Sequence, residues 1–275
     1  MNYFKFAAAT LITLFLCACG GSSEFSPVIT GVKVQSLRYG HTATIYLGGK
    51  DLRSSLVVDT GGVCDNPSFA ANSNTDTLVL NCTVKAVGEM PLIIKTDKGE
   101  VVFTTKLTVP KPQVSIFTSK GVISVELDPT IAPVSTNNFL AYVGNGFYKN
   151  TLFHRVIQSF VIQAGGYTAG MVKQPPLYGP IVLESNKGLS NLRGTIAMAR
   201  TGVINSATTE FYINLTDNLS LDYQNSTNPG YAVFGKVVQG LDVVDAIASE
   251  PIVVLNGFAD LPLQDITISL TLQTL

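Results

Sequence analysis

The stretch Val109-Pro110-Lys111-Pro112 constrains the fold most, because it separates two segments with different hydrophobic patterns. Neither proline can donate a backbone hydrogen bond to a β-ladder, and each favours an extended conformation in the residue before it. The stretch therefore predicts a connection between two folded units, one over residues 28–110 and one over residues 113–275. A chain of 275 residues is long enough to give each unit its own hydrophobic core.

The first unit has the pattern of a small all-β domain. Short runs rich in β-branched and aromatic residues alternate with turn sequences such as Gly48-Gly49, Gly61-Gly62 and Asp65-Asn66-Pro67. Several short strands at this spacing predict a β-sandwich, and we find no hydrophobic pattern of helical period in the segment. In these features it resembles bacterial immunoglobulin-like modules.

In the second unit the pattern changes to strands with two separated helices. Pro133 opens a run of helical period that ends at Gly144 or Gly146, and a second helix is predicted from Leu241 to Ser249. Most of the remaining runs are strands, so a closed antiparallel barrel capped at its ends is expected. The predicted strands are 113–117, 121–128, one or more through Gly166, 194–199, 210–214, 232–237 and 265–272.

Composition excludes several classes of partner. Only 13% of residues are charged and the net charge is −1, without long runs of either sign, so nucleic acid is not an expected partner. No glycine-rich nucleotide-binding motif stands between a strand and a helix, and no cofactor is predicted. A metal site is not predicted either, because His41 and His154 do not lie near the cysteines at metal-ligand spacing.

The N-terminal segment has the pattern of a secretory signal. Lys5 precedes the hydrophobic run Phe6–Leu16, which is too short to span a bilayer. The run continues into Leu16-Cys17-Ala18-Cys19, which resembles the lipobox of bacterial lipoproteins. The resemblance implies a signal peptide over residues 1–18 and a lipid on Cys19. An ordinary cleaved signal with incidental cysteines is the alternative.

Residues 19–27 are mostly small and polar, and we expect them to form a tether. Gly20 stands where an aspartate is associated with retention in the inner membrane, so the resemblance implies the outer membrane, with the protein facing the periplasm or the cell surface. Cys64 and Cys82 would then remain as a natural disulfide pair in an oxidising compartment.

The run Phe153–Gly166, FHRVIQSFVIQAGG, carries the candidate site. Arg155 is a permanent cation with a rigid fork of donors, and Gln163 supplies both a donor and an acceptor. Phe153 and Phe160 provide apolar surface beside them. The run contains no nucleophile and no pair of carboxylates, so a catalytic site here would work by orienting hydrogen bonds.

Four ordered blocks extend this pattern: APVSTNNFLAYVGNGFYKNTLFHRVIQSFVIQAGG, NLRGTIAMAR, TEFYINLTDNLSLDY and YAVFGKVVQGLDVVDAI. From about Val114 to the C-terminus they resemble the cyclophilins, which are peptidyl-prolyl cis-trans isomerases, and most of all the periplasmic bacterial branch. The resemblance implies a closed eight-stranded antiparallel barrel with two helices. It also implies an enzyme that isomerises X-Pro bonds in unfolded or exported polypeptides.

The resemblance also assigns roles to individual residues. Arg155 corresponds to the catalytic arginine, and Gln163 to the glutamine that hydrogen-bonds the substrate backbone and steadies that arginine. His154 and Tyr231 are expected at the rim of the site, although an isolated histidine is more often a packing residue. The implied substrate-binding residues are His154, Phe160, Val161, Ala199, Arg200, Glu210, Tyr212, Leu221 and Tyr231.

The chemistry explains why these residue types suffice. An X-Pro bond isomerises over a barrier of about 18–20 kcal/mol, because resonance gives it double-bond character. In the twisted transition state the prolyl nitrogen becomes a better hydrogen-bond acceptor. A guanidinium aimed at that nitrogen, or at the rotating carbonyl oxygen, binds the transition state more tightly than either ground state. No covalent intermediate and no general base are needed.

Two departures from the family pattern leave other interpretations open. Glu210 stands where a glutamine is usual, and Tyr212 replaces a phenylalanine of the pocket and adds a hydroxyl that needs a partner. We expect Glu210→Gln to keep or modestly raise turnover. The alternatives are a lipid-anchored module that binds proline segments with little turnover, and a structural role in the envelope led by the first unit.

Overall fold

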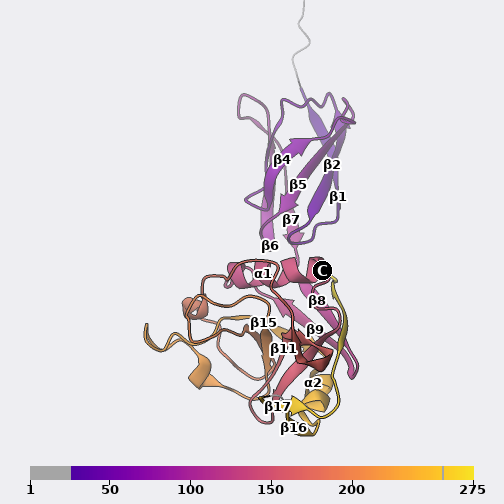
Figure 1. The fold of residues 1–275 in the computed structure, drawn as a ribbon. Helices are drawn as coiled ribbons and strands as arrows, with labels where there is room; N and C mark the ends of the chain where they lie inside the picture. Colours follow the sequence, from indigo (N-terminus) through magenta and orange to yellow (C-terminus); the bar gives the residue numbers. More distant parts are fainter. Residues whose placement is uncertain (1–25, 256) are drawn as a thin grey trace, which may run out of the picture.

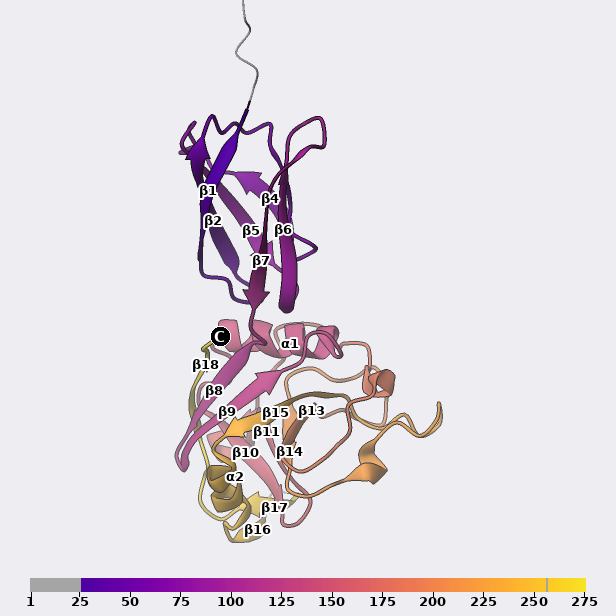
Figure 2. The same cartoon turned by 180° about the vertical axis from the view of Figure 1, so that it is seen from behind.

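The computed structural model describes residues 26–255 and 257–275, and these form two units stacked end to end (Figure 1). The predicted signal peptide, the predicted lipidation site Cys19 and most of the predicted tether lie outside the described residues. Seen from behind in Figure 2, β7 (Val101–Val109) runs down from the first unit and leads directly into β8 (Gln113–Thr118) of the second.

The first unit consists of two antiparallel sheets whose facing side chains form one core. One sheet has the order β1-β2-β5-β4 and the other β3-β6-β7. Ile45 and Leu47 from the first sheet, and Leu92 and Ile94 from the second, are fully buried in this core. The all-β prediction is confirmed, and the immunoglobulin-like classification stays a prediction. The remaining strands are β1 (Val28–Gln35), β2 (Thr42–Lys50), β3 (Val57–Asp59), β4 (Cys64–Phe69), β5 (Thr77–Val84) and β6 (Gly88–Lys95).

The sequence signals for β4 were misleading. Asp65-Asn66-Pro67 indicated a turn, but these residues lie inside a strand at the edge of the first sheet. The pairing of β4 with β5 is irregular between Asp65 and Ser68. Proline is tolerated in this setting, because an edge strand with a bulge does not need every backbone N–H for the ladder. The structure joins Cys64 in this strand to Cys82 in β5 by a disulfide.

The second unit is a nearly closed barrel. Its sheet runs β10-β11-β14-β13-β15-β9-β8-β18, and β12 pairs with β11 beside this path. At the seam, the backbone N–H groups of Asn150 and Phe153 donate to the carbonyls of Ile268 (2.7 Å) and Ile266 (2.9 Å). The eight-stranded prediction is thus confirmed for the described residues. The strands are β9 (Gly121–Leu127), β10 (Thr151–Ile157), β11 (Val161–Thr168), β12 (Val172–Lys173), β13 (Thr195–Met198), β14 (Phe211–Asn214), β15 (Val233–Gln239) and β18 (Ile268–Gln273).

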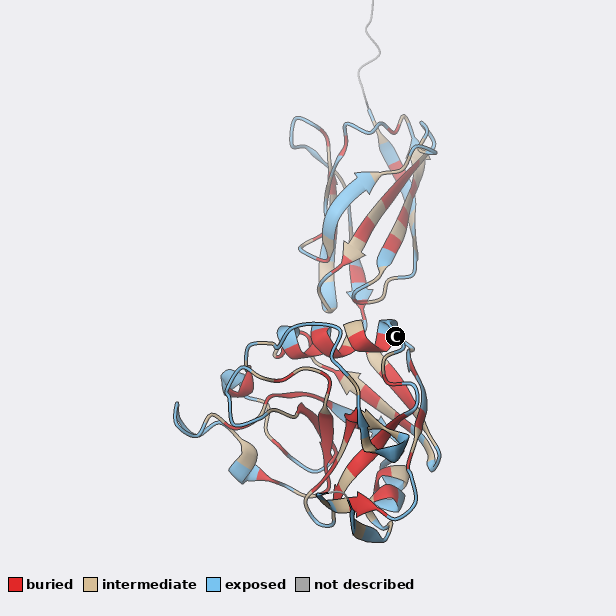
Figure 3. Ribbon diagram, in the orientation of Figure 1, coloured by how far each residue is buried: buried red, intermediate tan, exposed pale blue. Residues whose placement is uncertain are grey.

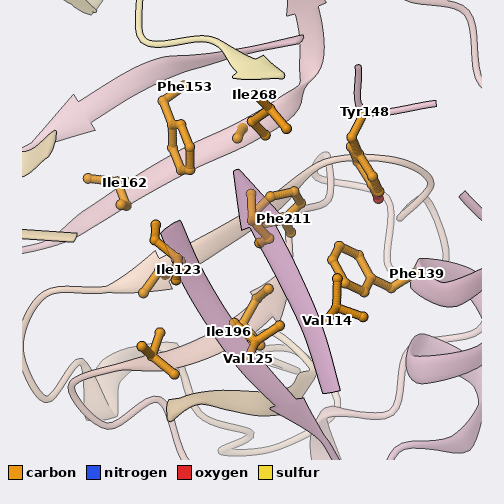
Figure 4. Close-up of a cluster of buried hydrophobic side chains, with 14 of the residues drawn as sticks. Val114, Ile123, Val125, Phe139, Tyr148, Phe153, Ile162, Ile196, Phe211 and Ile268 are labelled. Carbon is orange, nitrogen blue, oxygen red and sulfur yellow. The ribbon is translucent and has the colours of Figure 1, made fainter. Parts of the chain in front are cut away.

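The barrel interior is a packed core and not a channel. Burial alternates along β9, where Ile123, Val125 and Leu127 point inward, as expected for strands with one face in the core. The buried segments cluster along the barrel strands in Figure 3. Figure 4 shows Phe139 and Phe211 among the aliphatic side chains, and their rings meet edge to face with centroids 5.4 Å apart.

Two helices pack on the described part of the barrel, as the sequence predicted: α1 (Pro133–Gly144) and α2 (Leu241–Ala248). Pro133 suits the first turn of α1, where its missing N–H would have no partner within the helix. The N–H groups of Val134 and Ser135 donate to the distant carboxylate of Glu184 at 3.0 and 2.8 Å. Glu184 therefore caps this helix in place of a neighbouring side chain. None of the helices in the described residues is long and apolar enough to cross a bilayer.

A hairpin that the sequence did not indicate lies outside the barrel path. It consists of β16 (Ile252–Leu255) and β17 (Phe258–Pro262), which pair with each other, and β17 packs against β10. The hairpin is too short and too exposed to show a clear hydrophobic period. It matters because it brings one side chain, Asp260, to the candidate site.

Hydrogen bonds link the two units at the end of the barrel that carries α1 and β18. The hydroxyl of Tyr39 donates to Oδ1 of Asn137 at 3.0 Å, and His41 Nε2 lies 2.9 Å from Oε1 of Gln273. Tyr39 is buried, so it serves as a packing residue at this junction. The connection itself is held by an ion pair of 2.6 Å between Lys111 and Asp128.

Candidate active site

Strand register brings the predicted site residues onto one face of the barrel. Arg155 on β10 lies opposite Gln163 on β11, Gln163 lies opposite Tyr212 on β14, and Tyr212 lies opposite Ala197 on β13. Residues directly opposite each other in antiparallel strands share a face of the sheet. A row of side chains therefore crosses the four strands, although they come from distant parts of the sequence.

This row opens into a hollow of about 130 Å³. Its apolar walls belong to a small cluster that is separate from the barrel core, in which Val161, Ala197, Tyr212 and Val233 are buried. Nine of the residues predicted from the sequence meet here, and His154 and Glu210 are not among them. The lining consists of Arg155, Phe160, Val161, Gln163, Ala199, Arg200, Tyr212, Leu221 and Tyr231.

The guanidinium of Arg155 lies between two acceptors at the edge of this hollow. Its NH1 group is 3.5 Å from Oε1 of Gln163, and its Nε is 3.4 Å from Oδ2 of Asp260. Both contacts are long, and 41% of the side chain is exposed. Arg155 is thus oriented from two sides while donors stay accessible to a bound peptide.

Arg200 is held more firmly than Arg155. Its Nε donates to the carbonyl of Gly230 and its NH1 to the carbonyl of Thr201, both at 2.9 Å. The guanidinium carbon also lies 4.7 Å from the ring centroid of Tyr231, a cation–π geometry. The Arg200 side chain therefore forms part of a wall, and its main donors are already in use.

The hydroxyl of Tyr212, which the sequence left without a partner, donates to Oδ1 of Asn191 at 2.7 Å. Asn191 is fully buried, and its own amide group donates to Asp222 at 2.8 Å. Burial, aided by the nearby Tyr231 and Asp222, raises the pKa of the Tyr212 phenol far above its ordinary value. Tyr212 is consequently a neutral part of the wall of the hollow, and its hydroxyl is fixed by the hydrogen bond to Asn191.

His154 and Glu210 lie beside the hollow. His154 was expected at the rim, but its side chain is only 4% exposed, and its Nε2 is 3.2 Å from Oε2 of Glu210. The position is buried because the imidazole packs against the ring of Tyr167, with centroids 4.7 Å apart. The same Glu210 oxygen accepts a hydrogen bond of 2.8 Å from Nε2 of Gln163.

Glu210 is charged in spite of its burial. Burial alone would raise its pKa, but the hydrogen bond and charge of His154, the hydrogen bond from Gln163 and the charge of Lys173 together bring the pKa below the ordinary value. The residue also borders a neighbouring hollow of about 230 Å³ that includes Arg200. The carboxylate thus belongs to the surroundings of the site, with Gln163 as its link to Arg155.

Asp260 is the site residue that sequence patterns missed. It comes from the β16–β17 hairpin, about a hundred residues after Arg155 in the chain. An isolated aspartate in a short strand gives no local signal, and only the packing of β17 on β10 brings it to Arg155.

Comparison with known proteins identifies the family of the second unit. The family described as "Cyclophilin type peptidyl-prolyl cis-trans isomerase/CLD" matches residues 113–271, which is more than half of the chain. The chain therefore belongs to the cyclophilin-type peptidyl-prolyl cis-trans isomerases, and it is an enzyme of that class. Its substrates are accordingly proline-containing polypeptides.

Individual relatives are similar to part of the chain. A peptidyl-prolyl cis-trans isomerase of Acinetobacter baylyi is 46% identical over 155 residues, covering 56% of this chain and 81% of the relative. Peptidyl-prolyl cis-trans isomerase B of Escherichia coli is 44% identical over 157 residues, covering 56% of this chain and 95% of the relative. A solved cyclophilin-type isomerase of Cryptosporidium parvum aligns with 60% of this chain and 98% of its own, at 25% identity and a TM-score of 0.49.

Proposed function

We propose that Arg155 accelerates X-Pro isomerisation by stabilising the twisted amide through hydrogen bonds, without a covalent intermediate. The observation that carries the proposal is the partly exposed side chain of Arg155 at the edge of a hollow that also has apolar walls. Phe160, Val161, Tyr212 and Leu221 line that hollow and would hold the proline ring. The carbonyl before the proline then rotates while the ring stays in place.

The charge of Arg155 favours the transition state over both ground states. As resonance is lost, the prolyl nitrogen gains a lone pair and the carbonyl rotates, so a fixed cation nearby becomes more favourable. Gln163 and Asp260 hold the guanidinium at 3.5 and 3.4 Å, which reduces the reorganisation needed during the reaction. We expect the backbone of Ala199 and Arg200 to pair with the residues before the proline through groups other than the Ala199 N–H, which already donates to the carbonyl of Glu210 at 2.9 Å.

Arg155→Ala tests this mechanism. We expect kcat/KM on a Xaa-Pro-Phe peptide to fall about 10²- to 10³-fold, as for the loss of one preorganised donor elsewhere. Thermal stability should change little, because the side chain is 41% exposed. Arg155→Lys is the matched control that keeps the charge without the planar fork, and it should be intermediate. Equal activity of Arg155→Ala and the wild type would exclude the mechanism.

We further propose that the enzyme acts on exported proteins at the outer membrane, held there by a lipid on Cys19. The support is the lipobox-like sequence Leu16-Cys17-Ala18-Cys19, together with the disulfide between Cys64 and Cys82, which suits an oxidising compartment. β1 begins at the end of the first unit that lies far from the barrel (Figure 1), so this unit would act as a spacer between anchor and catalyst.

Metabolic labelling with palmitate tests the anchor independently of activity. We expect the wild type to incorporate label and to fractionate with outer membranes, whereas Cys19→Ser should do neither. Cys17→Ser serves as the control, since Cys17 would be removed with the signal peptide. Labelling that persists in Cys19→Ser would contradict the proposal.

A further inference from the structure

The pair formed by the partly buried Glu210 and the buried His154 has no part in the mechanism described so far. We propose that Glu210, fixed by His154, is a positioning residue that sets the orientation of the Gln163 amide and through it the orientation of Arg155. The inference rests on the proposed role of Arg155. It gives a specific task to the carboxylate that stands where the family usually has a glutamine.

The direction of the hydrogen bonds made by the Gln163 amide depends on Glu210. An ionised carboxylate only accepts, whereas an amide has one accepting and one donating end. Because Nε2 of Gln163 donates to Glu210 at 2.8 Å, its Oε1 must face the opposite way, toward NH1 of Arg155 at 3.5 Å. A flipped amide would place a donor against the guanidinium and an acceptor against the carboxylate. Both ends would then be unfavourable, so Glu210 leaves Gln163 one orientation.

The carboxylate itself is fixed by His154. His154 Nε2 lies 3.2 Å from the Glu210 oxygen that Gln163 uses, and the imidazole is 4% exposed. A hydrogen on Nε2 is required for this contact, since two acceptors would repel. Nδ1 of His154 is buried without a hydrogen-bond partner, so the histidine directs its one hydrogen bond at Glu210.

The backbone leaves room for Glu210 at Gly166. A Cβ atom on Gly166 would lie 2.6 Å from the carboxyl carbon and from Oε1 of Glu210. Any side chain at Gly166 would therefore displace the carboxylate. β11 thus supplies both the amide that Glu210 orients and the glycine that lets Glu210 reach it.

The charges around Glu210 favour its ionised form. His154 on β10 and Lys173 on β12 lower its pKa against the effect of burial. Arg155 and Asp260 line a hollow that also contains His154 and Glu210, and Arg200 lines the hollow on the other side. Cations thus outnumber anions on the elements that face the carboxylate, and the acceptor-only form is the working form at neutral pH.

A double-mutant cycle tests the inference. We expect Glu210→Ala to lower kcat/KM on a Xaa-Pro-Phe peptide by about tenfold in the wild type, but by less than about twofold in a Gln163→Ala background, as coupled residues do. Glu210→Gln should keep turnover at or slightly above the wild-type level, because its amide oxygen still accepts from Gln163. Equal losses in the two backgrounds would show that Glu210 acts on the substrate directly and would overturn the inference, as would no loss at all.

Two further measurements separate the inference from other effects. Glu250→Ala removes a similarly enclosed carboxylate, 11% exposed and paired with Lys120 at 2.6 Å, but outside the site. We expect it to lower thermal stability and leave kcat/KM unchanged, so a loss of activity with Glu210→Ala is not a general result of breaking an ion pair. Should Arg155→Ala retain full activity, the mechanism itself would fail. If the losses in the cycle are additive and Arg155→Ala is inactive, the positioning role of Glu210 is excluded but the proposed role of Arg155 is not.

Discussion

At the scale of single residues, the site is built from hydrogen bonds between side chains on different strands. Tyr212 donates to buried Asn191, and Asn191 in turn donates to Asp222. These contacts hold Tyr212, which forms part of the wall of the hollow. Both contacts connect residues that are more than twenty positions apart in the sequence, so local sequence patterns could not predict them.

Tyr212→Phe should separate the packing role of this ring from that of its hydroxyl. Oδ1 of Asn191 would keep only the contact from Nδ2 of Asn214, at 3.2 Å. We expect a loss of about 1 kcal/mol in the free energy of unfolding and a change in kcat/KM within about twofold, because the ring remains. Urea unfolding measures the change in stability, and the peptide assay measures the change in kcat/KM. A large loss of activity at unchanged stability would instead assign the hydroxyl to substrate contact.

Asp222 gives the fold a dependence on pH. Partial burial would raise its pKa, but hydrogen bonds from the Ser190 hydroxyl and from the side chain and backbone of Asn191 outweigh this and lower it. A folded-state pKa below the unfolded value stabilises the fold above the ordinary carboxyl range. That stability is lost as the pH falls through the folded pKa.

Asp222→Asn should therefore destabilise the protein at about pH 7 and make less difference at about pH 3, below the ordinary carboxyl pKa, where the wild type has begun to lose the same contribution. Urea unfolding at both pH values measures the difference. Asp97→Asn, in an exposed turn, is the control. A destabilisation of equal size at both pH values would show that the charge of Asp222 is not the cause.

At the scale of elements, close approach of the backbone fixes where α2 begins. Gly240 precedes this helix with φ of 88°, and a Cβ atom there would lie 2.3 Å from the carbonyl oxygen of Val122. Only glycine combines this left-handed conformation with so close a contact. The sequence predicted the start of α2 correctly, but it did not show why a glycine is needed there.

Gly240→Ala should lower the free energy of unfolding by about 3 kcal/mol, since strain and overpacking add. Gly202→Ala is the control, because φ there is not in the left-handed range and a Cβ atom would meet nothing within 4 Å. Thermal unfolding of the two variants compares them. Similar midpoints for both would contradict the steric argument.

At the scale of the whole molecule, the two units have separate cores and separate means of stabilisation. The core of the first unit contains Cys82, whose disulfide partner Cys64 is 18 residues away in the sequence. The barrel buries its own cluster around Phe139 and Phe211. The hydrogen bonds of Tyr39 and His41 join the units without merging these cores.

Replacing both Cys64 and Cys82 by alanine should lower the stability of the first unit by about 3 kcal/mol in the chain-entropy estimate. The kcat/KM of the isomerase should not change, because the hollow lies wholly in the barrel. Calorimetry and the peptide assay on the purified double variant test both expectations. An unchanged unfolding profile would show that the disulfide does not stabilise the unit, and reduced activity would show that the units are coupled.

The sequence by itself determined the two patterns on either side of Val109-Pro110-Lys111-Pro112, the helices at Pro133 and Leu241, and the family. These features follow from local chemistry: the backbone conformations that proline allows, the period of the hydrophobic residues and an ordered set of motifs. Nine of the predicted site residues proved to share one hollow.

Only the tertiary structure decided what surrounds Arg155. In the folded protein Asp260 lies beside the guanidinium and His154 is buried. Glu210 is in contact with both Gln163 and His154. The physical reason is that these contacts depend on strand register and on a hairpin packed outside the barrel. Pairings between strands far apart in the chain set them, and no sequence period encodes such pairings.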